Sequence, residues 1–429
     1  MFGFANFLLL ALFAAAVFDL IFALARGGGL RGALHGLWNT PHLLFGQQLA
    51  EWRLQLGRIL FAAGLAAYEI SVVFCNSMAR QNWAWVQGVM SPVLEWLAFL
   101  CFGAKILFGT RYTWRELLAG GALYFIARWV YFNSQNIWWI GIVVAVLAAK
   151  DVPLRRPLQV YFASGCAAMA VVLALHFAGI VAPDLTSERM GALRGTYGYG
   201  HPNTFGGLVF GLVLAYALLR AQKVRWVDCL LVFAIGVFLL VGPASRSAAL
   251  CTLALAVGLV FCRLRAGHSV PRCWPGTCAG MVGLTAAVSY LLPLLVIKVG
   301  PWNNDIGPAW LAKLDSLLTC RISLTWMAYR LLDVKIAGQV FNWPTVDNSF
   351  AFALFQFGPV VAALLGILFA AALLGHAKQG RRVEVCCLFA MLAYAYMEVQ
   401  PFHLTTNPTA LLLCGAVFAQ TSARWQKIE

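Results

Sequence analysis

Long hydrophobic stretches recur from one end of the chain to the other, separated by short polar segments. Runs of about 18 to 25 apolar residues are long enough to cross a bilayer as helices. They do not alternate apolar and polar residues, as the strands of a membrane β-barrel would. The pattern predicts helices at residues 4–25, 57–76, 88–108, 116–132, 135–149, 158–181, 203–220, 225–243, 246–263, 278–298, 347–374, 383–400 and 407–424.

Composition supports the same class of protein. Of the 429 residues, 62% are hydrophobic and 11% are charged, whereas a soluble domain carries about 25% charged residues. We therefore expect an all-α, polytopic integral membrane protein with about 12–13 transmembrane helices. Residues 1–56 are expected to form a membrane helix and a cytoplasmic connector with an interfacial amphipathic helix. Residues 57–429 are expected to form the transmembrane core.

The basic residues indicate an orientation. The net charge is +15, and every second loop is basic, which places those loops in the cytoplasm by the positive-inside rule. This charge is read as loop bias and attraction to anionic membrane lipids, so no nucleic-acid partner is expected. The basic loops contain Lys105, Arg111 and Arg115; Lys150, Arg155 and Arg156; Arg220, Lys223 and Arg225; Arg263, Arg265 and Arg272; Lys378, Arg381 and Arg382; and Arg424 and Lys427.

The other loops are then extracytoplasmic, and two of them are long: residues 181–202 and 298–346. A connection far above the usual few residues is commonly functional. Residues 310–332 carry apolar side chains at helical spacing, which predicts an amphipathic helix on the outer surface.

Arg194, Arg246 and Arg321 fall in these outer loops, against the charge bias, and Arg330 follows in the longest loop. The planar fork of arginine suits phosphate and diphosphate. Arg246 follows a tight turn, where an arginine is costly unless it faces a cavity or a partner. Alternatively, its side chain extends to the lipid headgroups.

Polar residues cluster where three outer loops meet predicted helices. Residues 194–207 are rich in glycine and include His201, Pro202 and Asn203 at a helix start, where free N–H groups favour anions. The alternative is a turn in which Asn203 caps the helix. Asp347 precedes the eleventh helix as a general base or as an N-cap.

Several further polar residues are open to two interpretations. Glu398, His403 and Asn407 lie in the last outer loop, where His403 could titrate near neutral pH; alternatively, all three are solvated loop residues. Within the spans, Arg128 is expected to pair with Glu69 or Glu95. The sequence has no P-loop pattern, zinc-ligand spacing or acidic metal pair on the outer face, so no metal and no cofactor is expected.

Taken in order, these segments resemble the O-antigen polymerase and ligase superfamily of bacterial membrane glycosyltransferases, most closely the polymerases of cell-surface and capsular polysaccharides. The resemblance covers most of the chain from the second predicted span and leaves residues 1–51 outside. In the ligase branch a histidine commonly precedes the asparagine before the late span, and Asp347 stands there instead. The matching segments are Arg194 to Gly206, Ser245-Arg246, Arg321 with Gly338, Asp347-Asn348 before a span with Gly358, and Glu398 before Asn407.

The resemblance implies an all-helical fold related to the GT-C glycosyltransferases, a lipid diphosphate donor and no metal. The expected function is an inverting, metal-independent glycosyltransferase that polymerises undecaprenyl-diphosphate-linked oligosaccharides at the outer face of the bacterial cytoplasmic membrane. Its site would face the periplasm or the exterior. A flippase and a chain-length regulator of the same pathway are the expected protein partners.

The residues receive roles on this hypothesis. Arg246 and Arg321 would clamp the diphosphate and stabilise charge on the leaving group, with help from Arg194 and Arg330. Asp347, or else His201, would take the acceptor proton. The sugar would be bound by Asn203, Tyr199, Asn348, Glu398 and His403.

Two other functions stay open from the sequence. A ligase would transfer finished glycan to a lipid, peptidoglycan or protein acceptor. A flippase or transporter would move the same lipid-linked sugar across the membrane and would show charged residues at mid-depth. Glycan chain length separates these activities, because loss of a ligase leaves long lipid-linked chains and loss of a polymerase leaves single repeat units.

Overall fold

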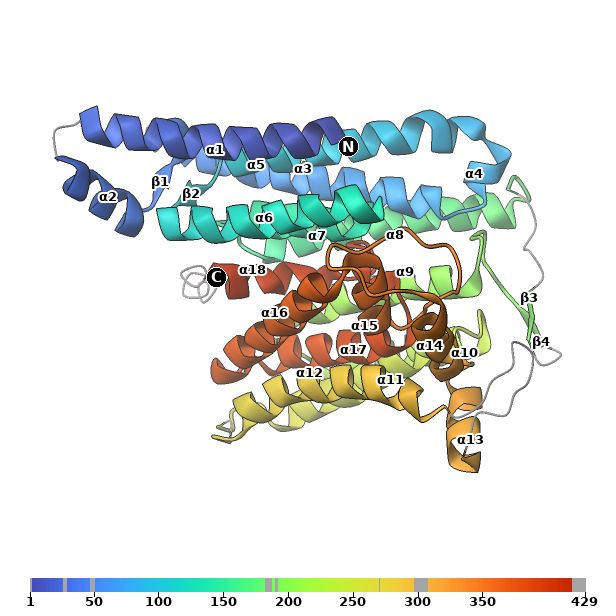
Figure 1. The fold of residues 1–429 in the computed structure, drawn as a ribbon. Coiled ribbons are helices and arrows are strands. Elements are labelled where there is room, and N and C mark those ends of the chain that lie inside the picture. The colour runs from blue at the N-terminus through green and yellow to red at the C-terminus, as the bar shows by residue number, and fades with distance from the viewer. Residues whose placement is uncertain are drawn as a thin grey trace.

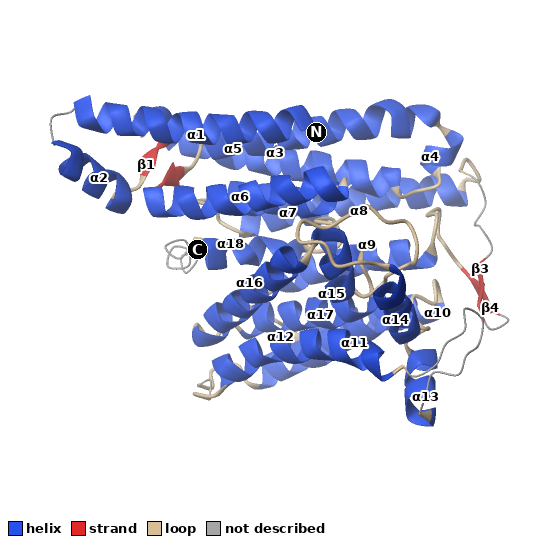
Figure 2. Cartoon of the chain, viewed as in Figure 1, coloured by secondary structure: helices blue, strands red, loops and turns tan. Residues whose placement is uncertain are grey.

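The structure is a computed structural model that describes residues 2–25, 29–46, 51–181, 187–189, 192–269, 271–296 and 308–418. These residues are predominantly helical (Figure 2), which confirms the expected all-α class. Eight helical segments among them are long and apolar enough to cross a membrane. Helix length and composition therefore indicate a multi-pass membrane protein. The segments are α1 (Phe2–Ala25), α3 (Glu51–Cys75), η2 (Val86–Met90) with α5 (Ser91–Phe108), α8 (Arg155–Phe177), α9 (Pro202–Leu219), α11 (Arg246–Leu264), α12 (Trp274–Leu291) with η3 (Leu292–Leu295), and α16 (Pro359–Lys378).

The other predicted spans are shorter or less apolar helices, which explains why fewer than the expected 12–13 segments meet the length and hydropathy of a span in the described part of the chain. One of these helices, α7 (Ile137–Ala148), is buried along almost its whole length. The last predicted span, residues 407–424, is described only as far as residue 418. These helices are α6 (Trp114–Ser134), α7 (Ile137–Ala148), α10 (Trp226–Val241), α17 (Arg382–Met397), and η6 (Pro408–Leu413) with α18 (Cys414–Val417).

The predicted helix at residues 347–374 is interrupted. It consists of α15 (Ser349–Phe352), the π-helical turn η4 (Ala353–Phe357) and α16, with a break at Gly358, whose φ is 88°. A Cβ on Gly358 would lie 2.1 Å from the carbonyl oxygen of Ile336. The chain before α15 therefore crosses the helix at this glycine, and a continuous helix has no room for it.

The amphipathic helix predicted at residues 310–332 is two helices, α13 (Ala309–Leu317) and α14 (Arg321–Leu331). Thr319 and Cys320 between them have positive φ angles of 61° and 62°. The buried carboxylate of Asp315 accepts hydrogen bonds from the backbone N–H groups of Ile322 at 2.7 Å and Ser323 at 3.2 Å. Apolar spacing alone did not reveal this side-chain cap, which starts a new helix in a new direction.

Short elements complete the description. The α2 helix (Gly29–Asn39) lies in the predicted connector of the N-terminal region. Two small antiparallel ribbons join β1 (His42–Leu43) to β2 (Arg111–Tyr112) and β3 (Ser187–Arg189) to β4 (Ala192–Arg194). The remaining elements are η1 (Leu44–Gly46), α4 (Ala79–Asn82) and η5 (Gln400–Phe402).

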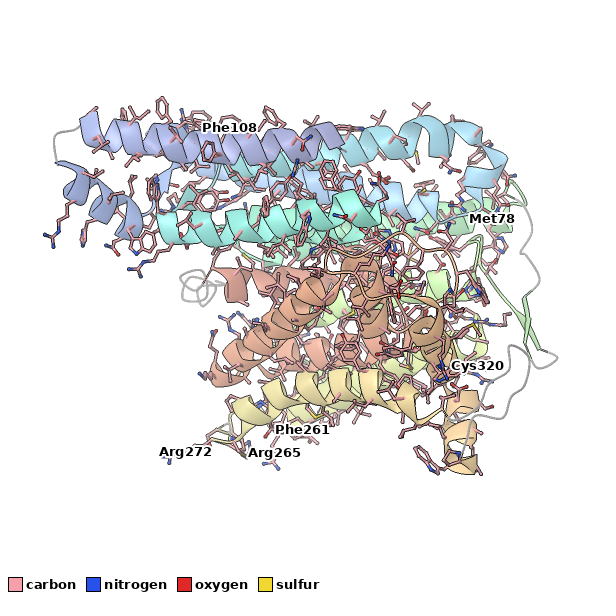
Figure 3. All side chains as sticks on the ribbon, viewed as in Figure 1. Met78, Phe108, Phe261, Arg265, Arg272 and Cys320 are labelled. Atoms are coloured by element: carbon pink, nitrogen blue, oxygen red, sulfur yellow. The ribbon has the colours of Figure 1, made fainter. Side chains whose placement is uncertain are left out.

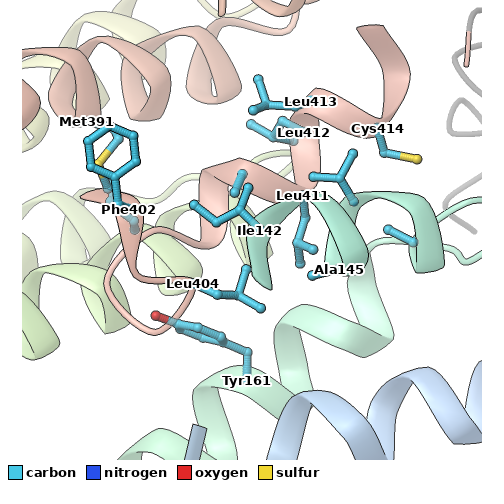
Figure 4. Close-up of a cluster of buried hydrophobic side chains, with 14 of the residues drawn as sticks. Ile142, Ala145, Tyr161, Met391, Phe402, Leu404, Leu411, Leu412, Leu413 and Cys414 are labelled. Atoms are coloured by element: carbon cyan, nitrogen blue, oxygen red, sulfur yellow. The ribbon is translucent and has the colours of Figure 1, made fainter. Parts of the chain in front are cut away.

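The long helices lie side by side in one bundle (Figure 1). In chain order, α3 packs against α5 and α8, α8 packs against α9, and α11 packs against α9, α10 and α17. The six residues of η6 are all buried inside the bundle, between α7 and α16, and Figure 4 shows Leu411 beside Ala145 of α7. This packing joins the last described helices to the first half of the chain.

Successive helices run in opposite directions, so the connections gather at two ends of the bundle (Figure 1). One end, which we call the basic end, holds the described loops that contain the clustered Lys and Arg residues; Arg424 and Lys427 lie outside the described residues. The other, the long-loop end, holds α4, α13, α14 and the β3–β4 ribbon. Figure 3 shows Met78 and Cys320 at the long-loop end and Arg265 and Arg272 at the basic end. The predicted alternation of basic and non-basic loops therefore corresponds to two physical ends.

Arg128 of α6 has a different partner from the predicted one. Its guanidinium donates hydrogen bonds of 2.8 and 2.6 Å to the side-chain oxygen of Asn6 in α1. It also lies over the ring of Phe132, 4.6 Å from the centroid. The prediction that Arg128 pairs with Glu69 or Glu95 is wrong. The side-chain amide of Asn6 accepts its hydrogen bonds instead, and the hydrophobic pattern does not predict that α1 packs beside α6.

Candidate functional site

Five polar side chains from five segments meet at the long-loop end. Each belongs to the end of an element: β4 ends, α9, α11 and α14 begin, and α17 has just ended. Positions at helix ends combine a rigid support with backbone groups that lack intrahelical partners. We call this set the Arg321–Glu398 cluster; its members are Arg194, Asn203, Ser247, Arg321 and Glu398.

Glu398 is the centre of the cluster. Its Oε1 accepts hydrogen bonds from Arg321 Nη2 at 2.6 Å, from Ser247 Oγ at 2.9 Å and from Asn203 Nδ2 at 3.0 Å. The side chains of the ion pair are 8% exposed for Arg321 and 7% exposed for Glu398. A buried carboxylate needs this number of donors, since a charge without them would be strongly destabilising.

Arg321 fixes the start of α14 against the end of α17. Besides its bond to Glu398, its Nε donates to the carbonyl oxygen of Met397 and its Nη1 donates to that of Leu318 at 2.9 Å. The guanidinium thus points its donors in three directions within one plane. A lysine at this position would supply only a point charge.

Arg194 and Asn203 connect the glycine-rich loop to the cluster. Arg194 Nη2 donates to Asn203 Oδ1 at 2.9 Å and to the carbonyl oxygen of Ala244 at 3.3 Å. The hydroxyl of Ser245 lies 3.5 Å from the same Asn203 oxygen. Gly206 makes this approach possible, because a Cβ there would lie 2.2 Å from Ser245 Oγ. Two of the predicted arginines, Arg194 and Arg321, are thereby brought to one buried site.

The environment changes the titration of Glu398. Its pKa is raised to about 7, chiefly by burial and also by the neighbouring charge of Asp347. The cation of Arg321 and the hydrogen bonds from Ser247 and Arg321 oppose the shift. A carboxyl group with this pKa exchanges a proton near neutral pH, which an exposed glutamate does not do.

The sequence left Asp347 open as a general base or as the N-cap of the following helix. Asn348, not Asp347, is the N-cap of α15: its side-chain oxygen accepts from the N–H groups of Phe350 at 2.9 Å and Ala351 at 3.1 Å. Its amide donates to Ser289 Oγ at 3.1 Å. Asp347 is half-buried and near enough to Glu398 to raise the pKa of that group, so it lies close to the cluster.

His201 is the N-cap of α9, where its Nδ1 accepts a hydrogen bond of 3.1 Å from the backbone N–H of Asn203. The neutral ring then carries its proton on Nε2. In this arrangement the lone pair that a general base needs is used for capping. The predicted anion site at this helix start is therefore joined by a capping role, with the ring of His201, rather than Asn203, capping the helix.

Arg246 and Arg330 lie outside the hydrogen-bonded cluster. Arg246 is the exposed first residue of α11, directly before Ser247. Arg330 is exposed on α14, with its guanidinium over the Trp326 ring at 5.4 Å. It follows Arg321 by nine residues, which is about half a turn out of phase at 3.6 residues per turn. Arg246 borders the site, whereas Arg330 is on another face of its helix.

Two of the predicted sugar-binding residues are placed beside the cluster rather than in it. Tyr199 is fully buried, with its ring 5.6 Å from that of Phe205, and its backbone pairs with Ser77. His403 packs on Trp138, 4.0 Å between ring centroids, and burial lowers its pKa to about 4. Both side chains hold loops of the long-loop end in place.

The prediction from sequence did not include Ser247 or the backbone carbonyl of Met397. Ser247 directly follows Arg246, and its place two residues after Ser245 at a predicted helix start was the available signal. No signal in the sequence indicated the Met397 carbonyl, because this carbonyl is free to accept a hydrogen bond only where α17 ends.

The arrangement supplies buried cations, amide and hydroxyl donors, and one carboxyl group that titrates near neutral pH. Such a site is suited to hold an anion and to move a proton beside it. Comparison of the chain with family models, with curated protein sequences and with solved structures found no match.

Proposed function

We propose that the protein is an inverting, metal-independent glycosyltransferase that polymerises oligosaccharide repeat units linked to a lipid diphosphate. The growing glycan would be transferred from its diphosphate carrier to a hydroxyl of the next lipid-linked unit. The observation that carries the proposal is the Arg321–Glu398 cluster, in which two arginines meet at one end of a bundle of apolar helices.

The arginines would act on the leaving group. Arg321 faces one carboxylate, and a lipid diphosphate brings more negative charge and more acceptor oxygens than Glu398 offers. The diphosphate would take over part of the Arg321 fork, while the approach of its charge would favour the protonated form of Glu398. Arg194 and Arg246 would contact the same anion from the two neighbouring segments. Charge that develops on the leaving group is then stabilised without a metal.

Asp347 would take the proton from the acceptor hydroxyl. It follows the long outer segment and lies two residues before α15, half-buried and close enough to raise the pKa of Glu398. Asn348 carries out the capping of α15, which leaves the aspartate free to face substrate. The aspartate in place of the histidine of the ligase branch favours a polymerase over a ligase.

A lipid substrate would find apolar surface beside the cluster. An apolar cavity of about 50 Å³ lies between α12, α15, α16 and η6. Ser349 lines this cavity and donates a hydrogen bond of 2.5 Å to the backbone carbonyl of Glu398. The cavity is too small to hold an isoprene unit, but its lining shows that apolar side chains adjoin the cluster where the hydrocarbon of a lipid diphosphate would begin.

The proposal is tested by the length distribution of lipid-linked and surface glycan in a deletion strain. Complementation with wild type should restore a ladder, whereas Arg321→Ala and Asp347→Ala should leave single repeat units on the outer leaflet. Matched controls are Arg80→Ala and Asp333→Ala, which change exposed residues of the long-loop end outside the cluster. Protein levels in the membrane are compared by immunoblot.

Other patterns would contradict the proposal. Long chains retained on the lipid carrier would assign a ligase, and single units on the cytoplasmic leaflet would assign a flippase. A full ladder with both Arg321→Ala and Asp347→Ala would exclude the cluster as the site of polymerisation.

A further inference from the structure

A second cavity lies at the basic end, at the other ends of the helices that carry the Arg321–Glu398 cluster. Its volume is about 700 Å³, and it is formed by the α9–α10 connection, the last turn of α11 and the α16–α17 connection. The same α9, α11 and α17 helices place Asn203, Ser247 and Glu398 at the long-loop end. This cavity is therefore separate from the site described above.

The lining of the cavity is strongly cationic. Lys223, Arg225, Arg263, Arg381 and Arg382 line it, against one acidic residue, Glu384. Arg382 has a structural role, because its guanidinium donates to the carbonyl oxygens of Arg265, His268 and Ser269 and so joins the α11–α12 loop to α17. Within the described residues, no hydrogen bond holds the side-chain nitrogens of Lys223, Arg263 and Arg381. Like charges gathered around a concavity repel one another, and an anion between them relieves this repulsion.

Two helix N-termini contribute further positive potential. The first residues of α10 and α17 line the cavity or adjoin it, at Arg225 and at Arg382, Val383 and Glu384. The helix dipoles favour an anion there, although each first turn already holds a carboxylate, Asp228 in α10 and Glu384 in α17, and Asp228 accepts the Arg225 N–H at 2.7 Å. The side-chain cations are therefore the main source of positive potential. The guanidinium forks of Arg263 and Arg381 match phosphate oxygens in geometry.

Exposed apolar surface continues from the cavity along two of these helices. On α10, Trp226, Val227 and Leu230 are 53%, 71% and 67% exposed, and on α11, Phe261 and Leu264 are 43% and 62% exposed. A tryptophan beside clustered basic residues is typical of the boundary between headgroups and hydrocarbon. An occupant with a phosphate and apolar chains fits both surfaces at once.

We infer that this cavity binds the phosphate headgroup of an anionic phospholipid, whose acyl chains lie along α10 and α11. Basic pockets between membrane helices recognise such headgroups through their phosphate. The bound lipid would connect the α9–α10 and α16–α17 hairpins through one anion. It would thereby hold together the helices whose other ends form the Arg321–Glu398 cluster.

The test uses the full-length purified protein in nanodiscs of phosphatidylcholine, to which phosphatidylglycerol is added. Binding is followed by the rise in melting temperature and by native mass spectrometry of retained lipid. The cavity variant is Lys223→Gln/Arg263→Gln/Arg381→Gln. The matched control, Arg155→Gln/Arg156→Gln/Arg272→Gln, removes the same charge from exposed residues of the same end outside the cavity.

We expect phosphatidylglycerol to stabilise the wild type and the control alike, and to bind the cavity variant at least about tenfold more weakly. The single variant Arg263→Gln should show an intermediate loss, which serves as the readout if the triple variant folds poorly. An equal loss in the cavity variant and the control would overturn the site, because general surface charge would then explain binding. If millimolar inorganic phosphate stabilises the protein equally in the absence of anionic lipid, the cavity binds free phosphate, and the inference that it binds a phospholipid is wrong.

Discussion

At the scale of single residues, Glu398 shows how the site is held together. It is 5% exposed and directly follows the last residue of α17, so the carboxylate has no solvent to neutralise it and depends on donors from three other segments. Each of those donors lies at the beginning of a helix. The ion pair therefore specifies how the ends of α9, α11, α14 and α17 meet, beyond any net stabilisation it provides.

The raised pKa of Glu398 predicts a pH dependence of stability. An unfolded glutamate titrates at about 4.3, whereas burial raises the pKa of Glu398 to about 7. Between these values the folded protein keeps a proton that the unfolded chain has lost. The free energy of unfolding should therefore fall as pH rises through this window, by at most about 1.4 kcal/mol per pH unit. Glu398→Gln removes this dependence.

Thermal unfolding of the purified protein between pH 4.5 and 7.5 measures the effect as the difference between wild type and variant. Glu51→Gln, which changes an exposed glutamate at the start of α3, is the matched control. Parallel pH profiles for wild type and Glu398→Gln would show that the carboxyl titrates outside this window.

Arg321 and Glu398 should be energetically coupled. Removal of one partner of a buried ion pair costs about 3–5 kcal/mol, because the other charge stays buried alone. We expect Arg321→Met to destabilise the protein strongly, and Arg321→Met/Glu398→Gln to recover part of the loss. A double-mutant cycle of unfolding free energies measures the coupling. Additive effects of the two substitutions would contradict a direct ion pair at 2.6 Å.

At the scale of elements, the long outer segment is attached to the bundle through two glycines. Gly338 and Gly358 have φ angles of 74° and 88°, and the backbone N–H of Gln339 donates to the carbonyl oxygen of Gln356 at 3.2 Å. A Cβ on Gly338 would lie 2.0 Å from that same carbonyl. The backbone around Gly338 thus contacts the backbone around Gly358, where η4 ends and α16 begins. This contact positions Asp347, which lies between the two glycines in sequence.

The substitution Gly358→Ala is expected to destabilise the protein by more than about 1–2 kcal/mol, since it adds a clash with Ile336 to the cost of a left-handed residue. Gly375→Ala in the same α16 helix is the matched control, because nothing lies within 4 Å of its Cβ position. That change should be neutral or should stabilise the helix by up to about 1 kcal/mol. Equal melting temperatures for the two variants would contradict the crossing of the two backbones.

The elements also show what apolar spacing can and cannot predict. Lengths of apolar runs identified the long helices to within a few residues, because bilayer thickness and backbone geometry constrain both. The break at Gly358 and the division of residues 310–332 into two helices were not predicted. Both depend on a contact from a distant segment or from a buried side chain, Ile336 in one case and Asp315 in the other. The spacing of apolar residues does not reveal either contact.

At the scale of the whole molecule, charge bias and helix alternation were enough to sort the loops into two ends. The site was predictable only in part: Arg194, Asn203, Arg321 and Glu398 were selected from polar residues near helix ends, and they do meet. Ser247 and the capping role of Asn348 followed from geometry that appears only when helices from distant parts of the chain pack together. The positive-inside rule predicts that the basic end of the bundle faces the cytoplasm.

Two native cysteines can test that direction. Cys320 is exposed at the long-loop end, between α13 and α14, and Cys273 is exposed at the basic end, directly before α12. In variants that keep one of them and replace the other eleven of the twelve cysteines with alanine, a membrane-impermeant maleimide has access from one side only. If the basic end is cytoplasmic, intact cells with a permeabilised outer layer should be labelled at Cys320 and protected at Cys273. Both positions should react once the cytoplasmic membrane is opened. If only Cys273 is labelled in intact cells, the bundle has the opposite orientation. The Arg321–Glu398 cluster would then face the cytoplasm, where a polymerase of exported glycan cannot work.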